Sequence, residues 1–388
     1  MTIAAEDHPV RLAIRSMRQR FITAARRGEF GRVVEMAPRA LLSEPAYEVR
    51  REFLAWCDSR PAPDPAFDRD VSVTRYFKGL QIRKASTPLA RQKCHKFRDL
   101  LSAIRRGHKT SRGYLPVVVL REAGDREIYS RRLDGTHRVA ICQYLGMGSM
   151  PVLAVTEDEY AAFAAREIPR GVIRQEIARW PKWYQAIEVL PGLWTRPHRP
   201  AKEGAMIAAL GEVDLAGRSV LDVGCNTGLY SLTAAVCGAR ALGVDKRAET
   251  IQQAEIVKAV WSVTHPMGGR AEFAAADVLA AAGDLLAGRD VLIMACVIYH
   301  LGDGLRSFLS AVAESKIDTI VCQGNLARAA KCSPEHLAAP AADRPARAIF
   351  DLAHFEAVLA PLGFAPVLAR PGAFPVGVFS RIAMRAER

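Results

Sequence analysis

The sequence predicts an α/β protein whose second half is a doubly wound parallel sheet, preceded by a smaller α+β domain. Three observations support this prediction. Strand-like and helix-like segments alternate from residue 219 onward, a glycine-bearing turn follows the first of these strands, and charge is divided unevenly between the two halves. With 388 residues, the chain is too long for one compact core and is expected to form two domains.

Composition and hydropathy exclude several classes of protein. Half of the residues are hydrophobic and 24% are charged, which is typical of a globular protein and not of a disordered, collagen-like or coiled-coil chain. The longest apolar run, Val291 to Ile298, is far shorter than the roughly 20 residues that span a bilayer. The acidic start, MTIAAEDHPV, lacks the apolar stretch of a secretory signal. We therefore expect a cytoplasmic protein without a membrane span.

The eight cysteines are scattered and form neither a CxxC pair nor a tight cluster with histidine. A disulfide framework and a metal site are therefore not expected. Most of the cysteines lie in apolar stretches and are interpreted as small core residues.

The basic character belongs to the first half of the chain. Residues 1–170 hold 31 Lys and Arg against 20 Asp and Glu, whereas residues 171–388 hold 23 against 21. A basic domain can bind phosphate, a nucleic acid or an acidic glycan. The alternative is a solvated arginine-rich surface in a chain with a general bias towards alanine and arginine. The charge count leaves both interpretations open.

The first 70 residues are expected to form a helical N-terminal segment. Val10, Ile14 and Met17 recur at helical spacing with arginines between them, and helices are predicted across residues 10–55. The Pro- and Asp-rich stretch 60–70 is interpreted as a loop or linker.

Residues 71–160 are expected to form a small α+β module, and residues 161–200 a linker with a tryptophan-rich lead-in. The elements predicted for the module are a basic helix over 85–107, strands over 114–120 and 127–133 joined by a turn at 124–125, a helix that ends at Gly146, and a strand over 150–155.

Residues 201–388 carry the regular alternation of strands and helices. The predicted strands are SVLDVGC, RALGVDK, AEFAAAD, DVLIMACV and TIVCQGN, and the helices that follow them span 229–237, 248–261, 278–287, 304–315 and 348–360. Two further strands are expected in the tail, as a hairpin. This order predicts a parallel sheet with helices on both faces.

The most specific signal is the segment VLDVGCNTGLYSL, residues 220–232, in which a strand enters a glycine-bearing turn and then a helix. Gly224 and Gly228 allow a ligand to approach the backbone closely, and Asp222 can accept a hydrogen bond from it. The next strand ends in Asp245, a position that can bind both ribose hydroxyls of an adenosine ligand. The third strand ends in Asp277, which can read an adenine amino group.

These residues leave two alternatives to a cofactor that carries both adenosine and a sulfonium group. Nicotinamide and flavin sites favour GxGxxG, whereas this turn has GxxxG spacing with Asn226 at its centre. Asp222 would also repel a pyrophosphate, while it suits a cofactor with a positive sulfonium and a free amino group. The remaining alternative is a tight turn without any ligand.

The segments VLDVGCNTGLYSL and GVDK resemble the class I S-adenosylmethionine (SAM)-dependent methyltransferases, which have a Rossmann-like sheet. The lead-in WYQAIEVLPGLWT and the segment CVIYHLGDGLRSFL are similar to the branch that contains the tRNA wobble-uridine methyl- and carboxymethyltransferases. The resemblance implies SAM as the cofactor. Its implied binding residues are Asp222, Gly224, Cys225, Asn226, Gly228, Asp245, Lys246, Asp277, Val278 and Cys296.

The resemblance also places Tyr299 and His300 beside the transferred group. His300 is a candidate general base for an acceptor hydroxyl, and Tyr299 can orient the acceptor or the methyl group. The alternative is that His300 caps the turn and Tyr299 packs in the core. Trp183 and Tyr184 are interpreted either as a flap over the cofactor or as a wedge between the domains. The basic element that holds tRNA in this branch is not recognisable here.

In the first half, RRLDGTHRVAICQYLG resembles the ParB/sulfiredoxin-like module, whose DG-x-HR turn holds phosphate or nucleotide groups. The matching positions are Asp134, Gly135, His137 and Arg138. Gly135 and the following helix expose N–H donors, and the other residues add charge. The alternative is that Asp134 and Arg138 form a structural pair.

Three functions follow as expectations. The first is SAM-dependent O-methylation of a small-molecule, glycan or nucleotide-linked acceptor that is hydroxylated or phosphorylated. The second is a tRNA wobble-uridine-type transferase, for which RNA is the partner. The third is a protein that binds SAM or nucleotides together with nucleic acid and has no catalytic activity.

Overall fold

The computed structural model describes residues 8–42, 44–60, 64, 66–82, 85–107, 111–123, 126–195, 202–265, 269–333, 335 and 345–382. The chain divides into two compact units, which we call the N-terminal unit (residues 15–167) and the C-terminal unit (residues 1–14 and 168–388). The sequence instead placed boundaries after residues 70, 160 and 200.

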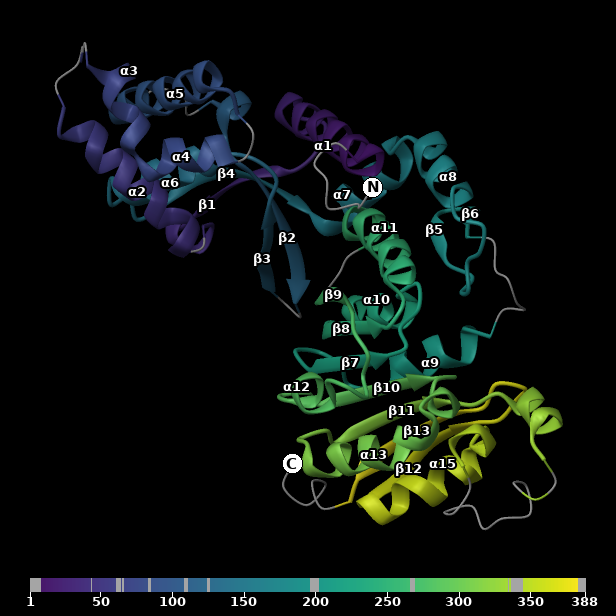
Figure 1. Ribbon diagram of the computed structural model, residues 1–388. Coiled ribbons are helices and arrows are strands. Elements are labelled where there is room, and N and C mark those ends of the chain that lie inside the picture. The colour runs from purple at the N-terminus through teal and green to yellow at the C-terminus, as the bar shows by residue number, and fades with distance from the viewer. Residues whose placement is uncertain are drawn as a thin grey trace. The chain divides into compact units, whose positions relative to one another are not determined.

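Figure 1 shows the elements of both units. The helices are α1 (Pro9–Arg27), α2 (Glu44–Asp58), α3 (Phe67–Asp70), α4 (Arg75–Ile82), α5 (Thr87–Arg105), α6 (Thr136–Tyr144), α7 (Glu157–Glu167), α8 (Arg170–Ala178), α9 (Gly204–Glu212), α10 (Leu229–Val236), α11 (Ala248–Thr264), α12 (Ala282–Leu286), α13 (Leu305–Glu314) and α15 (Leu352–Leu359). The strands are β1 (Arg32–Met36), β2 (Val117–Ala123), β3 (Arg126–Arg132), β4 (Met150–Thr156), β5 (Glu188–Leu190), β6 (Leu193–Trp194), β7 (Ser219–Val223), β8 (Arg240–Asp245), β9 (Arg270–Ala275), β10 (Val291–Ala295), β11 (Thr319–Gln323), β12 (Phe364–Arg370) and β13 (Val376–Arg381).

The C-terminal unit contains a seven-stranded sheet in the order β12-β13-β11-β10-β7-β8-β9. Strands β7 to β11 are parallel, and β13 joins β11 and β12 in antiparallel pairs. This confirms the predicted α/β fold, including the terminal hairpin. The chain order reverses between the neighbouring strands β7 and β10, and ligands of open α/β sheets bind at such a switch point.

The sequence of β7 explains why this strand lies at the centre of the sheet. All five residues of SVLDV are buried, which requires cover on both faces. Leu221 and Val223 pack in one core with residues of α13 and α15, while α10 and α11 lie on the other face (Figure 1). The buried strand ends at Asp222 and Val223, where the turn towards α10 begins.

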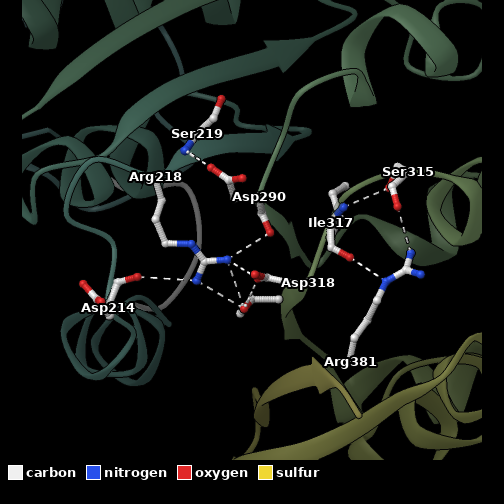
Figure 2. Close-up of polar contacts among 9 residues, drawn as sticks. Asp214, Arg218, Ser219, Asp290, Ser315, Ile317, Asp318 and Arg381 are labelled. Carbon is white, nitrogen blue, oxygen red and sulfur yellow. Dashed lines mark hydrogen bonds and ion pairs between the residues drawn. The ribbon is translucent and has the colours of Figure 1, made fainter. Parts of the chain in front are cut away.

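At the amino edge of the sheet, two arginines connect loops that are far apart in the sequence (Figure 2). Arg218 forms an ion pair with Asp318 and donates to the carbonyl of Asp290 at 3.2 Å. Arg381 donates to the carbonyls of Val312 at 2.8 Å and Ile317 at 2.6 Å, and so satisfies groups at the end of α13.

The N-terminal unit contains a four-stranded sheet in the order β1-β4-β2-β3. Strands β2 and β4 are parallel, and the other pairs are antiparallel. The predicted strand–strand–helix–strand order is therefore present as β2, β3, α6 and β4. Residues 32–36 were expected to be helical and instead form β1, because this short segment pairs with β4.

The helical segment before residue 70 is not a separate domain. Leu41, Phe53 and Leu54 are buried in the same core as Val118 and Val139, since these apolar faces cover the sheet. The 60–70 stretch contains the helix α3, but residues 61–63 and 65 lie outside the described part of the chain, as does the turn predicted at 124–125. The expected linker contains α8, β5 and β6.

Candidate functional site

Asp222, near the end of β7, is fully buried. Its Oδ2 accepts a 2.6 Å hydrogen bond from the Ser231 hydroxyl of α10, while its Oδ1 has no partner among the described residues. Burial raises the pKa of this carboxyl to about 7, and the Ser231 hydrogen bond opposes the rise. A buried carboxylate with one unused oxygen is suited to a cationic hydrogen-bond donor.

The turn after β7 has three residues in the left-handed region: Gly224 (φ 67°), Asn226 (φ 56°) and Gly228 (φ 84°). A Cβ at Gly224 would lie 2.6 Å from Val297, and one at Gly228 would lie 2.6 Å from the Phe273 ring. The glycines are therefore required by backbone conformation and by close packing of the protein's own side chains. The sequence had suggested only the approach of a ligand.

Cys225 lies between these positions and is buried. Its backbone N–H donates to the carbonyl of Val244 at 2.9 Å, which fastens the turn to β8. Its contribution to the site is thus made through the backbone.

Gln185 supports the turn from the lead-in segment, a role that the sequence analysis missed. Its Oε1 accepts hydrogen bonds from the Thr227 hydroxyl at 2.7 Å and from the backbone N–H of Leu229 at 3.3 Å. These contacts satisfy the first backbone N–H of α10 and hold the side chain of Thr227 in place. The position of Gln185 beside Trp183 and Tyr184 in the recognised lead-in was the available signal.

Trp183 is a core residue of the C-terminal unit and not a flap. Its ring is buried, and its Nε1 donates to the carbonyl of Ile177 at 2.9 Å. Tyr184 is half-buried, and the Lys202 ammonium lies 4.7 Å from the centre of its ring.

The acidic residues on the neighbouring strands differ in their surroundings. Asp245, at the end of β8, is only 7% exposed, and its Oδ1 accepts from the backbone N–H of Arg247 at 2.9 Å. Lys246 is exposed. Asp277 is also exposed and accepts from the N–H of Leu279, whereas Val278 packs in the core. Of the predicted acids on these strands, Asp222 and Asp245 are thus the two that are buried, and they lie close enough for Asp245 to raise the pKa of Asp222.

A cavity of about 300 Å³ opens beside the turn. Its lining residues come from the lead-in segment, the turn and the start of α11, and are Trp180, Pro181, Lys182, Tyr184, Asn226, Arg247, Glu249, Thr250 and Gln253. Asn226 is 7% exposed, and its Oδ1 has no partner within the described part of the chain. A second cavity of about 380 Å³ lies at the opposite edge, around Arg218 and Arg381, away from the predicted site residues.

The end of β10 carries the other predicted residues. Cys296 has a left-handed backbone (φ 54°), and its Sγ lies 3.6 Å from Gln323 Oε1. Tyr299 is buried, with the Arg328 guanidinium carbon 3.9 Å from its ring centre. Burial raises the pKa of Tyr299, so its hydroxyl stays protonated at neutral pH.

Tyr299 and His300 lie on one 3₁₀ turn, Ile298–His300, and His300 is exposed. Its ring centre lies 4.8 Å from that of Tyr299. The two residues are therefore neighbours at the carboxyl edge, as the sequence predicted, but only His300 can exchange protons with solvent directly.

The DGTHR turn of the N-terminal unit differs from its sequence interpretation. Asp134 pairs with Arg26 at 2.5 Å and not with Arg138. Gly135 (φ 90°) is the N-cap residue before α6, and a Cβ there would lie 2.5 Å from Pro116. Burial, together with nearby cations, lowers the pKa of His137 to about 4, and its Nε2 lies 2.6 Å from the Tyr76 hydroxyl.

Arg138 lies one residue further along α6. Burial and the neighbouring Arg26 lower its pKa, and its Nε has no partner among the described residues. The cations that depress the pKa of His137 are Arg50, Lys93 and Arg132. The start of α6 is thus surrounded by positive charge, with Asp134 as an adjacent acid.

The eight cysteines are free thiols. Within the described ranges, no group of three or more His, Cys, Asp and Glu side chains is arranged to hold a metal ion. None of the described helices combines the length and apolar character needed to cross a membrane.

No protein-family model matches the chain, and no curated protein matches it either. Similar solved structures include magnesium protoporphyrin IX methyltransferase from Synechocystis PCC 6803 with bound SAM, at 18% identity and a TM-score of 0.32, covering 46% of this chain and 75% of that chain. The N-terminal domain of EvdMO1 with S-adenosylhomocysteine (SAH) and D-fucose is 19% identical (TM-score 0.40; 55% and 96% covered). WbdD is 18% identical (TM-score 0.39; 54% and 46% covered).

Proposed function

We propose that the protein is a SAM-dependent methyltransferase that acts on an oxygen of a hydroxylated or phosphorylated acceptor. The observation that carries the proposal is the buried Oδ1 of Asp222, which has no partner among the described residues and lies beside a glycine turn at the switch point of the sheet. The candidate acceptors are a glycan, a nucleotide-linked sugar or a small metabolite. We propose that the protein is located in the cytoplasm, as expected from its sequence.

The residues at the carboxyl edge fit SAM in charge and in hydrogen-bonding capacity. Asp222 Oδ1 can accept from the amino group of SAM, and the buried carboxylate of Asp245 can accept from ribose hydroxyls. Asn226 Oδ1 offers a further acceptor at the cavity beside them. Unpaired buried acceptors cost free energy until a ligand donates to them, so these atoms favour a ligand with several donors.

SAM supplies the methyl group when it is bound: a C–O bond forms to the acceptor as the S–C bond breaks, and sulfur becomes a neutral thioether. The chain aligns the acceptor with the methyl group and removes the hydroxyl proton. His300 is exposed and can pass this proton to solvent. Tyr299, whose hydroxyl stays protonated, is suited to donating a hydrogen bond that orients the acceptor.

Calorimetric titration with SAH tests the cofactor site. Asp245→Ala should weaken SAH binding by about 10- to 100-fold, because hydrogen bonds to a carboxylate are worth roughly 1.5–3 kcal/mol. Asp284→Ala, at an exposed position of α12, is the matched control and should bind as the wild type does. Unchanged affinity in Asp245→Ala would contradict the placement of the cofactor. His300→Ala should lower turnover more than SAH affinity.

A second candidate function concerns nucleic acid or nucleotides at the N-terminal unit. Phosphate binding there is favoured by the positive charge around the start of α6 and by the Nε of Arg138, which has no partner within the described ranges. Arg138→Ala should abolish any rise in melting temperature caused by a nucleotide, a sugar phosphate or RNA. If RNA is the partner, its affinity should fall steeply between low and moderate salt, as expected of a tRNA-modifying enzyme or a non-catalytic nucleic-acid binder.

A further inference from the structure

Two cationic side chains lie at the carboxyl edge of the sheet in the C-terminal unit. Lys202 lies just before α9, and its ammonium lies 4.7 Å from the ring centre of Tyr184 and 5.9 Å from that of Phe374. Burial raises the pKa of the Cys296 thiol, and the neighbouring Lys202 and Tyr299 oppose this rise. The guanidinium of Arg328 covers the ring of Tyr299 at 3.9 Å. Lys202 and Arg328 therefore both lie near the residues that follow β10, although they come from segments that are far apart in the sequence.

The carboxylate next to these two cations is that of Glu203, and it is engaged by backbone N–H groups. None of the ion pairs within the described ranges includes Lys202 or Arg328. Glu203 is buried, and its oxygens accept from the backbone N–H groups of Ala186 and Lys202. The aromatic rings below the cations offset only part of the cost of holding positive charge away from water.

The loop that carries Arg328 is fixed by backbone hydrogen bonds. Asn325 N–H donates to the Phe350 carbonyl at 2.9 Å, and Leu326 N–H donates to the Ala373 carbonyl at 3.0 Å. The Nε of Arg328 is buried and has no partner among the residues that the structure describes. A positioned guanidinium with an unused buried donor is prepared for an acceptor oxygen supplied by a ligand.

We propose that the acceptor carries an anionic group, a carboxylate or a phosphate, which binds between Lys202 and Arg328. This inference rests on the proposed function, because it assigns these residues to the acceptor of that reaction. Asp222 and Asp245 are the acids assigned to SAM, so a neutral acceptor would leave Lys202 and Arg328 without an anionic partner. Arg328 supplies planar, directional donors, and Lys202 supplies a compact charge.

Thermal denaturation of the SAH-loaded protein tests the proposal, with inorganic phosphate, glucose 1-phosphate and glucose as probes. All variants carry Arg138→Ala, so that the phosphate site proposed for the N-terminal unit does not contribute. Phosphate and glucose 1-phosphate should raise the melting temperature, and glucose should not. Arg328→Gln and Lys202→Gln should each lose most of this rise, whereas Arg306→Gln, at an exposed position of α13, should keep it.

Calorimetry with SAH separates the acceptor from the cofactor. SAH affinity should stay within about twofold of the wild type in Arg328→Gln and Lys202→Gln. A tenfold loss of SAH affinity would mean that the two cations bind the carboxylate of the cofactor, and would overturn the proposal. Equal stabilisation of all variants by phosphate would overturn it as well. If the wild type does not bind SAH, the proposed function fails, and this proposal with it.

A labelled methyl donor gives an independent readout with a metabolite extract. The labelled product should be retained on an anion exchanger, and Arg328→Gln should reduce the retained label at least tenfold. Label found only in the unretained, neutral fraction would overturn the proposal.

Discussion

The Ser231 hydroxyl donates a 2.6 Å hydrogen bond to Asp222, and this bond joins the first turn of α10 to the end of β7. It fixes one oxygen of a fully buried carboxyl group and leaves the other without a partner among the described residues. The same carboxyl therefore orders the turn and stays available to a ligand. Because this carboxyl is buried, the free energy of unfolding of the ligand-free protein should depend on pH.

Asp222→Asn should stabilise the unbound protein at pH 8 while it weakens SAH binding. The folded-state pKa of Asp222 is raised from 3.8 to about 7, so ionisation is less favourable in the folded state than in the unfolded state. The penalty is absent below pH 3.8, grows as the pH rises towards 7, and is fully present above 7.

Melting temperatures measured from pH 4 to pH 8 check this prediction. The advantage of Asp222→Asn over the wild type should be largest at pH 8, on the order of a few kcal/mol in the free energy of unfolding, and should disappear towards pH 4. A variant that is less stable than the wild type at pH 8 would contradict the assigned burial cost.

Gln185→Ala should lower both stability and SAH affinity. The substitution removes the oxygen that accepts from Thr227 and Leu229, and leaves two buried donors unsatisfied. The expected loss in the free energy of unfolding is about 1–3 kcal/mol. Gln252→Ala, at a half-buried position of α11, is the control and should change the free energy of unfolding only slightly. Chemical denaturation of the two variants gives the comparison, and equal losses would show that Gln185 does not support the turn.

Gly228→Ala should destabilise the protein much more than Gly288→Ala. Both glycines have positive φ, but only Gly228 is crowded, with the Phe273 ring and the Ala254 Cβ within 3 Å of an added methyl group. Backbone strain costs about 1–2 kcal/mol at either site, and overpacking adds roughly 1–3 kcal/mol at Gly228. Urea denaturation measures the difference. Similar midpoints would mean that the turn can relax away from Phe273.

His137→Gln should remove a pH-dependent part of the stability of the N-terminal unit. The pKa of His137 is lowered from 6.5 to about 4, so its contribution is fully present above pH 6.5 and is lost as the pH falls towards 4. The wild type should therefore lose stability relative to His137→Gln over this interval, in melting experiments.

Tyr76→Phe is the control for this prediction. It removes the hydroxyl that contacts His137 and keeps the imidazole. It should cost about 0.5–1.5 kcal/mol at every pH and retain the pH dependence of the wild type. A flat difference between the wild type and His137→Gln would show that the imidazole is not buried.

The parallel sheet could be predicted because its central strands are buried on both faces and are mostly apolar. SVLDV (β7) and VLIMA (β10) are such segments, and each is followed by a turn. Strand β1 could not be predicted, because residues 32–36 are mostly exposed and acquire strand structure only by pairing with β4. Local sequence carries little information about such long-range pairing.

The site residues could be predicted where an ionisable side chain lies at the end of a strand, next to a turn, as for Asp222 and Asp245. Gln185, Lys202 and Arg328 could not be found in this way, since their contacts join elements distant in the sequence. The pair of Asp134 with Arg26 was missed for the same reason, as the partners are 108 residues apart. A single sequence shows residue types and spacing, but not which helix approaches which turn.

The arginine anchors at the amino edge of the sheet have a consequence for redesign of this protein. Arg218 and Arg381 hold the strand starts and the end of α13 together through loops that take no part in the proposed chemistry. The opposite rim can therefore be remodelled, for example by exchanging the 326–331 segment for one with other side chains, while the scaffold keeps its strand order. Acceptor preference should be an engineerable property of this framework.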